Sequence, residues 1–308
     1  MIIVTGPTAL GKTRLAARLA AFYGGEIISA DSRQVFKNMD IGTGKDLNDY
    51  VVDGDKVPFY LVDIRFPGDT FSVYDFVEEY NRQRPEIIRR GKHVIVCGGT
   101  GLYIEAIIAG YHLPYVPVDQ ELREKLQSMS DEQLIRMLAD LRPLHNTTDI
   151  TDRDRLVRAL EIELWKKKHP GDAPTIPPYL ILGLTAERQE LRRRITERLH
   201  HRLKNGLIEE VQTLLERGVP HEKLEFYGLE YRYVYRYLKG QLSLQEMTDQ
   251  LNTAIHQFAK RQQTWFRRME RKGFHIHWLN AEIGPDELFT QARRTLDEHR
   301  NQWDELAQ

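Results

Sequence analysis

The stretch Gly6-Pro7-Thr8-Ala9-Leu10-Gly11-Lys12-Thr13 decides how this chain of 308 residues folds. It matches the pattern G-x-x-x-x-G-K-[S/T] at every fixed position. The apolar run 1–4 before it predicts a buried parallel strand, and Leu15, Leu19 and Phe22 after it have helical spacing. Strand, loop and helix in this order are the context that the pattern requires. The sequence therefore predicts a loop that binds the phosphates of a diphosphate or triphosphate.

Each fixed residue of this loop has a physical task in holding phosphate. The glycines let backbone N–H groups turn toward phosphate oxygens, and the N-terminus of the following helix adds a favourable dipole. Lys12 supplies a positive charge, and the hydroxyl of Thr13 is a candidate ligand of Mg²⁺. The alternative is a glycine-rich turn that contains Lys-Thr by chance, which the flanking strand and helix disfavour.

The composition is that of an ordinary globular protein, with 41% hydrophobic residues, 29% charged residues and a net charge of −1. No apolar run is long enough to span a membrane and no signal-peptide pattern precedes the first strand, so we expect a cytoplasmic protein without a membrane partner. The single cysteine, Cys97, excludes an intrachain disulfide. Positive charge is local: residues 188–204 hold seven Lys or Arg against two Glu, and residues 260–272 hold six against one. Such stripes, rather than net charge, indicate a surface for nucleic acid.

Polar side chains follow two further predicted strands. Residues 26–30 lead to Asp31-Ser32-Arg33-Gln34, and residues 92–97 lead to Gly98-Gly99-Thr100. Ligands of open parallel sheets bind at the carboxyl ends of strands, so Asp31 and Thr100 are candidate site residues. The alternative for Asp31 is a helix N-cap.

A second acidic position ends the strand predicted at 58–63. This residue, Asp63, is a candidate for the acid that supports Mg²⁺ in P-loop proteins that hydrolyse nucleotides. Between Gln34 and this strand, the glycine-rich run 39–45 predicts a loop near the phosphates, with Lys45 as a solvated lysine.

The pattern becomes helical and polar after residue 112. Helices are predicted near 119–128, 131–141 and 152–168, and the segment 171–178 is a break before a strand at 179–184. We therefore expect a first part of the core at 1–112, a helical insertion at 113–178, a return to the core with basic helices at 179–280, and a helical tail at 281–308.

Two later segments combine a packing face with a basic face. In the helix from residue 188, one stripe holds Leu191, Ile195, Leu199 and Leu203, and the stripe beside it holds Arg194, Arg198 and Arg202. Residues 258–268 interleave aromatic and basic side chains, a mixture that suits the bases and phosphates of RNA. The alternatives are a solvated surface for the arginines and core positions for Phe258 and Trp265.

Six motifs in this order resemble those of tRNA dimethylallyltransferases over about residues 1–280: Gly6 to Thr13; Asp31 to Gln34 with Met39 to Lys45; Gly98-Gly99-Thr100-Gly101-Leu102-Tyr103; Arg158-Ala159-Leu160-Glu161; Gly206-Leu207 with Glu210-Val211; and Ala259-Lys260-Arg261-Gln262 with Thr264-Trp265-Phe266-Arg267. The resemblance implies an α/β fold of the P-loop NTPase and nucleotide-kinase type, a parallel sheet flanked by helices, with an inserted helical subdomain that grips the anticodon stem. It also implies transfer of a dimethylallyl group from dimethylallyl diphosphate to N6 of adenine 37 in tRNA, by an enzyme that uses Mg²⁺ and that we expect to be a monomer.

The resemblance also assigns roles to individual residues. It gives diphosphate and nucleotide binding to Gly6, Pro7, Thr8, Ala9, Leu10, Gly11, Lys12 and Thr13, and the metal to Thr13. The catalytic residues that it implies are Asp31, Thr100, Lys12, Arg194 and Arg198, with Asp31 as the base that faces N6. The residues that it implies in tRNA binding are Asp31, Ser32, Arg33, Gln34, Thr100, Arg123, Asp154, Arg155, Leu156, Val157, Arg158 and Arg261.

The chain departs from the family pattern at four places. The family usually has Lys-Pro at Lys45-Asp46, two histidines at Phe59-Tyr60, Asp-Pro near Thr147-Thr148, and Ile-Gly-Tyr-Lys-Glu at Tyr227-Gly228-Leu229-Glu230-Tyr231. These changes fall mostly on parts that would meet RNA or shape the site, as expected of a divergent copy of the family.

Two other functions remain open from the residues. A P-loop phosphotransferase or NTPase that acts on a nucleotide or RNA through Asp63 explains the phosphate loop, but it gives no role to residues 98–103 or to the basic stripes. An RNA-binding module with a degenerate nucleotide pocket would be expected to have lost Lys12 or Thr13, and both are present.

Overall fold

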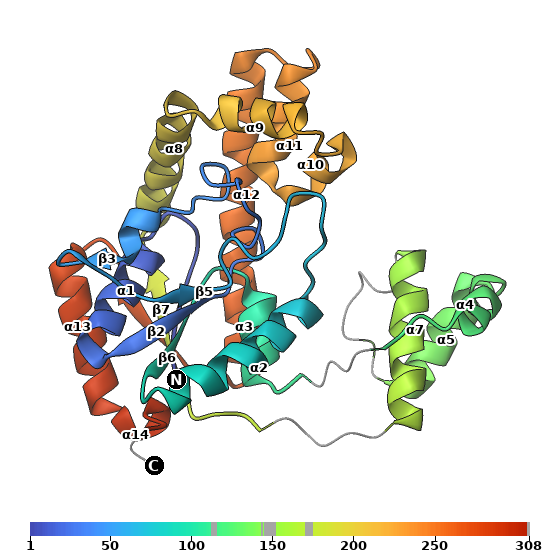
Figure 1. Ribbon diagram of the computed structural model, residues 1–308, viewed down its shortest axis with the longest axis horizontal. Helices are drawn as coiled ribbons and strands as arrows, with labels where there is room; N and C mark the ends of the chain where they lie inside the picture. The colour runs from blue at the N-terminus through green and yellow to red at the C-terminus, as the bar shows by residue number, and fades with distance from the viewer. Residues whose placement is uncertain (112–115, 143, 145–151, 170–174, 307–308) are drawn as a thin grey trace. The chain divides into compact units, whose positions relative to one another are not determined.

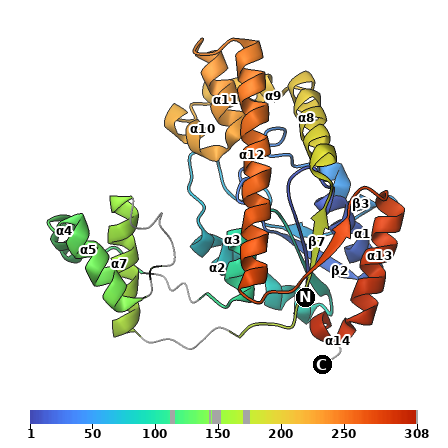
Figure 2. The same ribbon diagram turned by 180° about the vertical axis from the view of Figure 1, so that it is seen from behind.

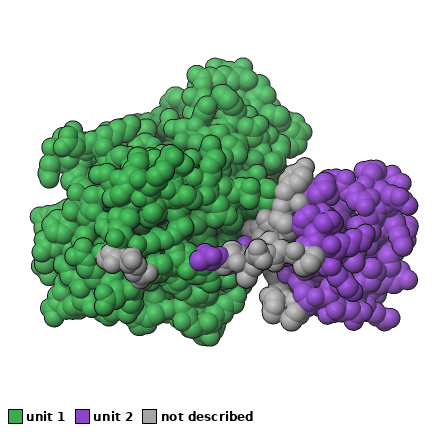
Figure 3. All heavy atoms as spheres, turned by 60° about the horizontal axis from the view of Figure 1, so that its bottom comes forward, with its two compact units in different colours: residues 1–109, 176–308 green, residues 110–175 purple. Residues whose placement is uncertain are grey.

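A computed structural model describes residues 1–111, 116–142, 144, 152–169 and 175–306. The chain forms two compact units, one of residues 1–109 and 176–308 and one of residues 110–175 (Figure 3). None of the described helices is long and apolar enough to cross a membrane. Thr147-Thr148 and the first part of the predicted break, residues 171–174, lie outside the described residues.

The first unit is built on a six-stranded sheet whose strand pairs are all parallel, in the order β5-β2-β6-β1-β7-β8. The strands are β1 (Ile2–Thr5), β2 (Gly25–Ser29), β5 (Phe59–Tyr60), β6 (His93–Cys97), β7 (Leu180–Thr185) and β8 (Ile276–Asn280). β1 lies between β6 and β7, and its four residues are fully buried, as their apolar run predicts. The predicted α/β fold is confirmed.

Helices cover both faces of this sheet. α1 (Lys12–Tyr23) and α13 (Pro285–Glu298) pack together on one side, and α2 (Val73–Arg89) and α3 (Gly101–Ile108) pack together on the other (Figures 1 and 2). α1 buries the apolar positions Leu15 and Leu19 against the sheet, while Phe22, predicted on the same stripe, is 52% exposed. The short α14 (Arg300–Trp303) is the last helix of the described chain and is anchored by the fully buried Trp303.

Four helices lie beyond the carboxyl edge of the sheet: α8 (Arg188–Lys204), α9 (Leu207–Glu216), α10 (His221–Tyr227) and α11 (Leu229–Leu238). α12 (Leu244–Arg271) packs on α8 and α11 at this edge and runs back beside the sheet to α3 (Figures 1 and 2). α12 is the longest, and it begins at a capping box in which Ser243 and Glu246 bond each other's backbone N–H. Its buried residues recur every three or four positions, which lets one face pack along its whole length. Between β2 and β5 lie the 3₁₀ turn η1 (Leu47–Tyr50) and the small antiparallel pair β3 (Val51–Val52) and β4 (Asp55–Lys56).

The second unit contains α4 (Gln120–Gln127), α5 (Asp131–Leu141) and α7 (Arg153–Lys168). Asp119, Ser130 and Asp152 cap these helices through side-chain oxygens, at the starts that the sequence predicts. Their apolar faces form a separate small core of Leu126, Leu134, Leu138, Leu156, Val157 and Leu160. The tRNA-binding role of this unit stays a prediction.

Three predicted elements differ from the structure. The strand at 58–63 shortens to Phe59–Tyr60, because Leu61 and Asp63 adopt positive φ angles of 63° and 57° that no strand accommodates. Asp31 starts a turn and no described helix begins there, so the N-cap alternative is wrong. β8 was not expected; it pairs with β7 at the edge of the sheet before the helical tail begins.

Candidate active site

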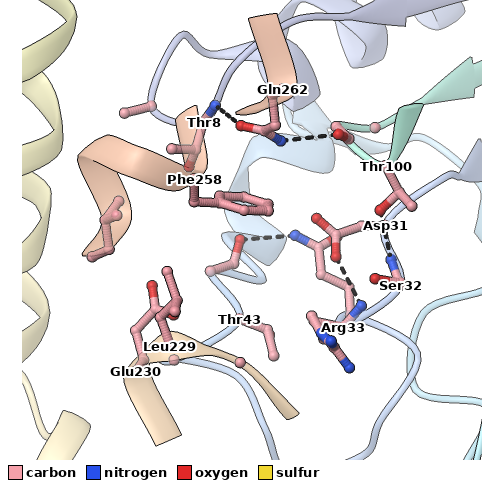
Figure 4. Close-up of a pocket in the computed structure, with 18 of the residues that line it drawn as sticks. Thr8, Asp31, Ser32, Arg33, Thr43, Thr100, Leu229, Glu230, Phe258 and Gln262 are labelled. Carbon is pink, nitrogen blue, oxygen red and sulfur yellow. Dashed lines mark hydrogen bonds between the residues drawn. The ribbon is translucent and has the colours of Figure 1, made fainter. Parts of the chain in front are cut away.

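The phosphate loop, the ends of β2 and β6, and the helices α8, α10, α11 and α12 enclose one cavity of about 670 Å³ (Figure 4). It lies wholly within the first unit, at the carboxyl edge of the sheet where ligands of such folds bind. Its walls come from Thr8, Ala9, residues 11–13, residues 31–34, residues 42–44, Asp46, Asp49, Tyr50, residues 97–102, Arg198 and Arg202 of α8, residues 225–230, Arg232, and the α12 residues Ile255, Phe258, Arg261, Gln262 and Trp265.

The phosphate loop has the geometry that its glycines predict. Gly6 has φ 136° and passes so close to β7 that a Cβ would lie 2.5 Å from the carbonyl oxygen of Leu184. Gly11 is the N-cap of α1 in the left-handed conformation (φ 76°), and no side chain caps this helix. The first N–H groups of α1 are therefore left to an anion.

Lys12 is a cation held inside this loop. Its Nζ donates to the carbonyl oxygen of Pro7 at 2.9 Å. Burial, reinforced by the charge of Arg198, lowers the pKa of Lys12 to about 8. A bound anion would raise the pKa of Lys12 again by stabilising its charged form, so Lys12 is placed to bind an anion.

Gln262 fixes the phosphate loop to the neighbouring strand end. Its Oε1 accepts from the backbone N–H of Thr8 at 3.0 Å, and its Nε2 donates to the carbonyl of Gly99 at 2.9 Å (Figure 4). The sequence motif contains Gln262, but nothing in the sequence indicates this role, because the contacts join residues more than 160 positions apart.

Asp31 and Thr100 come together as predicted. The hydroxyl oxygen of Thr100 accepts from the N–H of Ser32 at 3.1 Å, and Asp31 Oδ1 accepts from the N–H of Arg33 at 2.9 Å (Figure 4). A Cβ on Gly98 would lie 2.2 Å from the carbonyl oxygen of Ala30, so only glycine allows the ends of β2 and β6 to meet so closely. Among the described residues nothing donates to Asp31 Oδ2, which leaves this oxygen as a proton acceptor.

Arg33 is a second cation of the cavity. It points into the cavity in Figure 4, and no described residue accepts a hydrogen bond from its guanidinium. Surrounding protein lowers the pKa of Arg33, and the nearby charge of Asp31 opposes this shift. Gln34 is positioned differently, because its Nε2 donates to the carbonyl of Gly44 at 3.0 Å.

The three arginines of the predicted stripe on α8 have different surroundings. Arg198 reaches the phosphate loop, where its Nη1 donates to Thr8 Oγ1 at 3.2 Å. Arg202 also lines the cavity, but it is buried and pairs with Glu230 at 3.0 Å, so it is not part of a solvated surface. Arg194 does not line the cavity, because Glu190 and the carbonyl of Ala281 hold it at 2.6 and 3.1 Å.

Lys45 is not solvated, contrary to the expectation from the sequence. Its side chain is 0% exposed and its Nζ donates to Asp40 at 2.8 Å, to the carbonyl of Phe36 at 2.5 Å, and to Asp63. A buried ammonium requires such compensation. Asp63 thus serves Lys45, and it does not line the cavity.

Aromatic side chains of α12 form one wall of the cavity. Phe258 and Trp265 line it together with Ile255, and Phe258 is 40% exposed, so the core alternative for Phe258 is wrong. Arg261 stands over the ring of Phe258, with its guanidinium carbon 5.9 Å from the ring centre. The spacing of residues 258, 261, 262 and 265 places them on one helical face, a signal that the sequence does contain.

Thr13 and several oxygen ligands fit a divalent metal. Thr13 lines the cavity beside Lys12, and so does the carboxylate of Asp31. Asp46 and Asp49 line it too, but Arg198 and Arg14 pair with them at 2.8 and 3.1 Å. Among the described residues there is no group of three His, Cys, Asp or Glu side chains arranged to hold a metal ion. A hard cation that keeps several waters and binds mainly through a diphosphate suits this donor set.

The residues of the second unit that were predicted to bind tRNA divide into three groups. Arg123 and Arg158 both donate hydrogen bonds to the carboxylate of the buried Glu161, at 2.7 to 2.8 Å. Leu156 and Val157 are buried in the core of this unit, so their side chains pack and do not face RNA. The exposed members of the predicted run are Asp154 and Arg155.

Comparisons with known proteins identify the family. The model of the IPP transferase family matches residues 34–269. The tRNA dimethylallyltransferase 1 of Porphyromonas gingivalis (strain ATCC 33277) is 51% identical over 289 residues, which are 93% of this chain and 96% of that relative. The tRNA dimethylallyltransferase 2 of Pelobacter propionicus is 49% identical over 299 residues, which are 96% of this chain and 93% of that relative.

Solved structures agree. The full-length tRNA isopentenylpyrophosphate transferase of Bacillus halodurans superposes with a TM-score of 0.71 at 32% identity, over 99% of this chain and 97% of that one. A eukaryotic dimethylallyltransferase acting on tRNA superposes with a TM-score of 0.79 at 21% identity, over 96% of this chain and 77% of that one, and supports the fold. The chain belongs to the IPP transferase family, among the tRNA dimethylallyltransferases.

Proposed function

We propose that this protein transfers a dimethylallyl group from dimethylallyl diphosphate to N6 of adenine 37, next to the anticodon of tRNA. One observation carries the proposal: a phosphate loop and a carboxylate with a free oxygen, Asp31, face the same cavity. In the reaction, a C–N bond forms between N6 and the allylic carbon while the C–O bond to the diphosphate breaks. The proton of N6 goes to Asp31, and inorganic pyrophosphate leaves.

The diphosphate would bind at the loop of residues 6–13. Free N–H groups at the start of α1, the ammonium of Lys12 and the guanidinium of Arg198 converge there. These charges neutralise the leaving group as the allylic bond breaks, which is where charge develops in the transition state. Mg²⁺ held through Thr13 would supply further neutralisation of the diphosphate.

The adenine would bind at the opposite wall. N6 of adenine is a poor nucleophile, since its lone pair is delocalised into the ring, so loss of its proton must accompany bond formation. Asp31 Oδ2 is available as the general base, and Thr100 lies beside it through the N–H of Ser32. Arg33, which has no partner among the described residues, supplies a charge for an RNA phosphate near the entering nucleotide.

A base inside an anticodon loop has to leave its stack to enter this cavity. Unstacking costs a few kcal/mol, which new contacts have to repay. Phe258 and Trp265 provide aromatic faces, and Arg261 provides a charge beside them. We also propose that Arg123, Asp154, Arg155 and Arg158 of the second unit lie along the anticodon stem, since Asp154 and Arg155 are exposed and Arg123 and Arg158 are partly exposed.

The alternative, an NTPase that uses Asp63, lacks support. Asp63 neutralises Lys45 and does not line the cavity, so it offers no ligand to a metal on the phosphates. We further propose that the enzyme acts as a monomer in the cytoplasm, because the cavity is formed by one chain and its substrates are a tRNA and a small diphosphate.

The test is incubation of the purified protein with radiolabelled dimethylallyl diphosphate and total tRNA, followed by digestion to nucleosides. We expect label in N6-dimethylallyladenosine from position 37 and a requirement for a divalent cation. A parallel reaction with labelled ATP reports hydrolysis. Hydrolysis of ATP without any transfer to tRNA would refute the proposal.

A further inference from the structure

Two guanidinium groups of α8 converge above one glycine at the cavity wall. A Cβ on Gly44 would lie 2.4 Å from Arg198 Nη2 and 1.8 Å from Arg202 Nη2. Each arginine has its own carboxylate partner: Asp46 lies 2.8 Å from Arg198, and Glu230 lies 3.0 Å from Arg202. Both acids stand at positions where the chain departs from the family pattern.

The two pairs differ in their access to solvent. The side chains of Arg202 and Glu230 are 11% and 16% exposed, so this pair compensates a charge that burial would otherwise penalise. The side chains of Arg198 and Asp46 are 30% and 59% exposed. The Arg198–Asp46 pair is therefore open at the cavity wall, where an entering anion can reach it.

Arg198 joins Asp46 to the phosphate loop. Its Nη1 donates to Thr8 Oγ1 at 3.2 Å, and its Nη2 donates to Asp46 Oδ2 at 2.8 Å and more weakly to the carbonyl of Gly44 at 3.4 Å. Asp46 is the N-cap of η1, but its side chain makes no cap hydrogen bond. The carboxylate is thus bound to the arginine and is not needed by its own backbone.

We propose that Asp46 is a resident counter-ion that Arg198 exchanges with the diphosphate, so that Asp46 lowers the affinity of the cavity for pyrophosphate. The choice of ligand rests on the proposed function. If the diphosphate displaces Asp46, the ion pair has to break; if both share the guanidinium, two anions lie side by side. Either route makes the free energy of pyrophosphate binding less favourable than it would be in a chain without this carboxylate.

The exchange assists release of the product. After transfer, pyrophosphate remains among Lys12, the loop N–H groups and Arg198, which together favour its retention. Asp46 gives Arg198 an alternative partner while pyrophosphate leaves, so the arginine does not have to return to solvent without a counter-charge. Product release limits turnover in many enzymes, so such a partner is useful.

Binding of inorganic pyrophosphate to the full chain tests the proposal without prenyl transfer. In calorimetry we expect the dissociation constant of Asp46→Asn to fall about two- to fivefold, as loss of one exposed ion pair implies. Glu197→Gln is the matched control. It also removes one negative charge that is paired with an arginine of α8, but that arginine, Arg193, does not line the cavity. This variant should leave the dissociation constant unchanged.

A double-mutant cycle separates exchange from a general change of charge. In the Arg198→Gln background, Asp46→Asn should no longer tighten binding, because the partner for which the anions compete is gone. Equal or weaker binding by Asp46→Asn, the same gain without Arg198, or no pyrophosphate binding by the parent protein would each overturn the proposal. Failure of the proposed function is a different result: pyrophosphate binds, but no dimethylallyl group reaches tRNA.

Discussion

Replacement of Asp31 by asparagine tests the proton transfer on which the proposed reaction depends. The carboxylate accepts one hydrogen bond within the described chain, from the N–H of Arg33 at 2.9 Å, and an asparagine oxygen can accept the same bond. Shape and hydrogen bonding are therefore kept, while the capacity to accept a proton is lost. General-base catalysis contributes about 10²- to 10⁴-fold to a rate, so we expect single-turnover transfer to slow by that factor. This corresponds to a rise of about 3 to 5 kcal/mol in the activation free energy.

Asp63→Asn is the matched control, because it removes the acid that the rival function needs. Lys45 keeps Asp40 as a counter-ion, and Asp63 is 38% exposed, so the loss should cost about 1 to 3 kcal/mol of stability, less than for a fully buried pair. Transfer should stay within a few-fold of the parent rate below the unfolding temperature. Thermal unfolding of both variants verifies that Asp31→Asn, unlike Asp63→Asn, leaves stability nearly unchanged.

The assay measures transfer of radiolabelled dimethylallyl groups with enzyme in excess over tRNA, and filter binding measures tRNA affinity separately. The reasoning requires that Asp31→Asn binds tRNA and pyrophosphate as the parent does and fails only in transfer. Transfer by Asp31→Asn at the parent rate would refute the role of this carboxylate. Loss of transfer only in Asp63→Asn would refute the whole assignment of the two acids.

Three further predictions follow from the cavity. Affinity for inorganic pyrophosphate, measured by calorimetry, should fall by at most tenfold per pH unit as pH rises through about 8, where Lys12 loses its proton; an affinity that does not change with pH would contradict this role of Lys12. Lys12→Ala should slow transfer of the dimethylallyl group by about 100-fold or more. Arg261→Gln should reduce the salt dependence of tRNA binding by about 0.7 to 0.9 in log–log slope, whereas Arg202→Gln should instead destabilise the fold by about 2 to 4 kcal/mol, since it leaves Glu230 unpaired. Phe258→Ala should weaken tRNA binding by about 1 to 3 kcal/mol in filter assays, and unchanged binding would exclude stacking on this ring.

Local signals in the sequence predicted the phosphate loop and the helices of the second unit. Gly6 and Gly11 are required by positive φ angles, and Ser130 and Asp152 cap helices that begin within one residue of them. These features depend on neighbours within a few positions. The sequence therefore holds all the information that they need.

Features that depend on distant contacts were not predictable in this way. Lys45 has the sequence context of a surface lysine, and its burial is explained by Asp40 together with Asp63, which lies 18 positions later. β8 was missed because, as an edge strand, it buries only Ile276 and Leu279 and so lacks the continuous apolar run of β1. Arg202 repeats the spacing of Arg198, yet Glu230 gives it a structural task.

Three of the departures from the family pattern, Phe59, Tyr60 and Tyr231, have partners within the described chain, which explains how the fold tolerates them. The hydroxyl of Tyr231 donates to Glu210, whose carboxylate also accepts three backbone N–H groups of residues 40–42 at 2.7 to 3.0 Å. The hydroxyl of Tyr60 donates to Glu26 at 2.7 Å, and Phe59 packs against Tyr50 with ring centres 4.2 Å apart and ring planes tilted by 31°. Each of these three residues thus has a partner that satisfies its hydroxyl or packs its ring. Because Glu210 holds the backbone of residues 40–42 and Gly42 lines the cavity, the departure at Tyr231 acts on the cavity wall through Glu210, whereas the departures at Phe59 and Tyr60 lie outside the cavity.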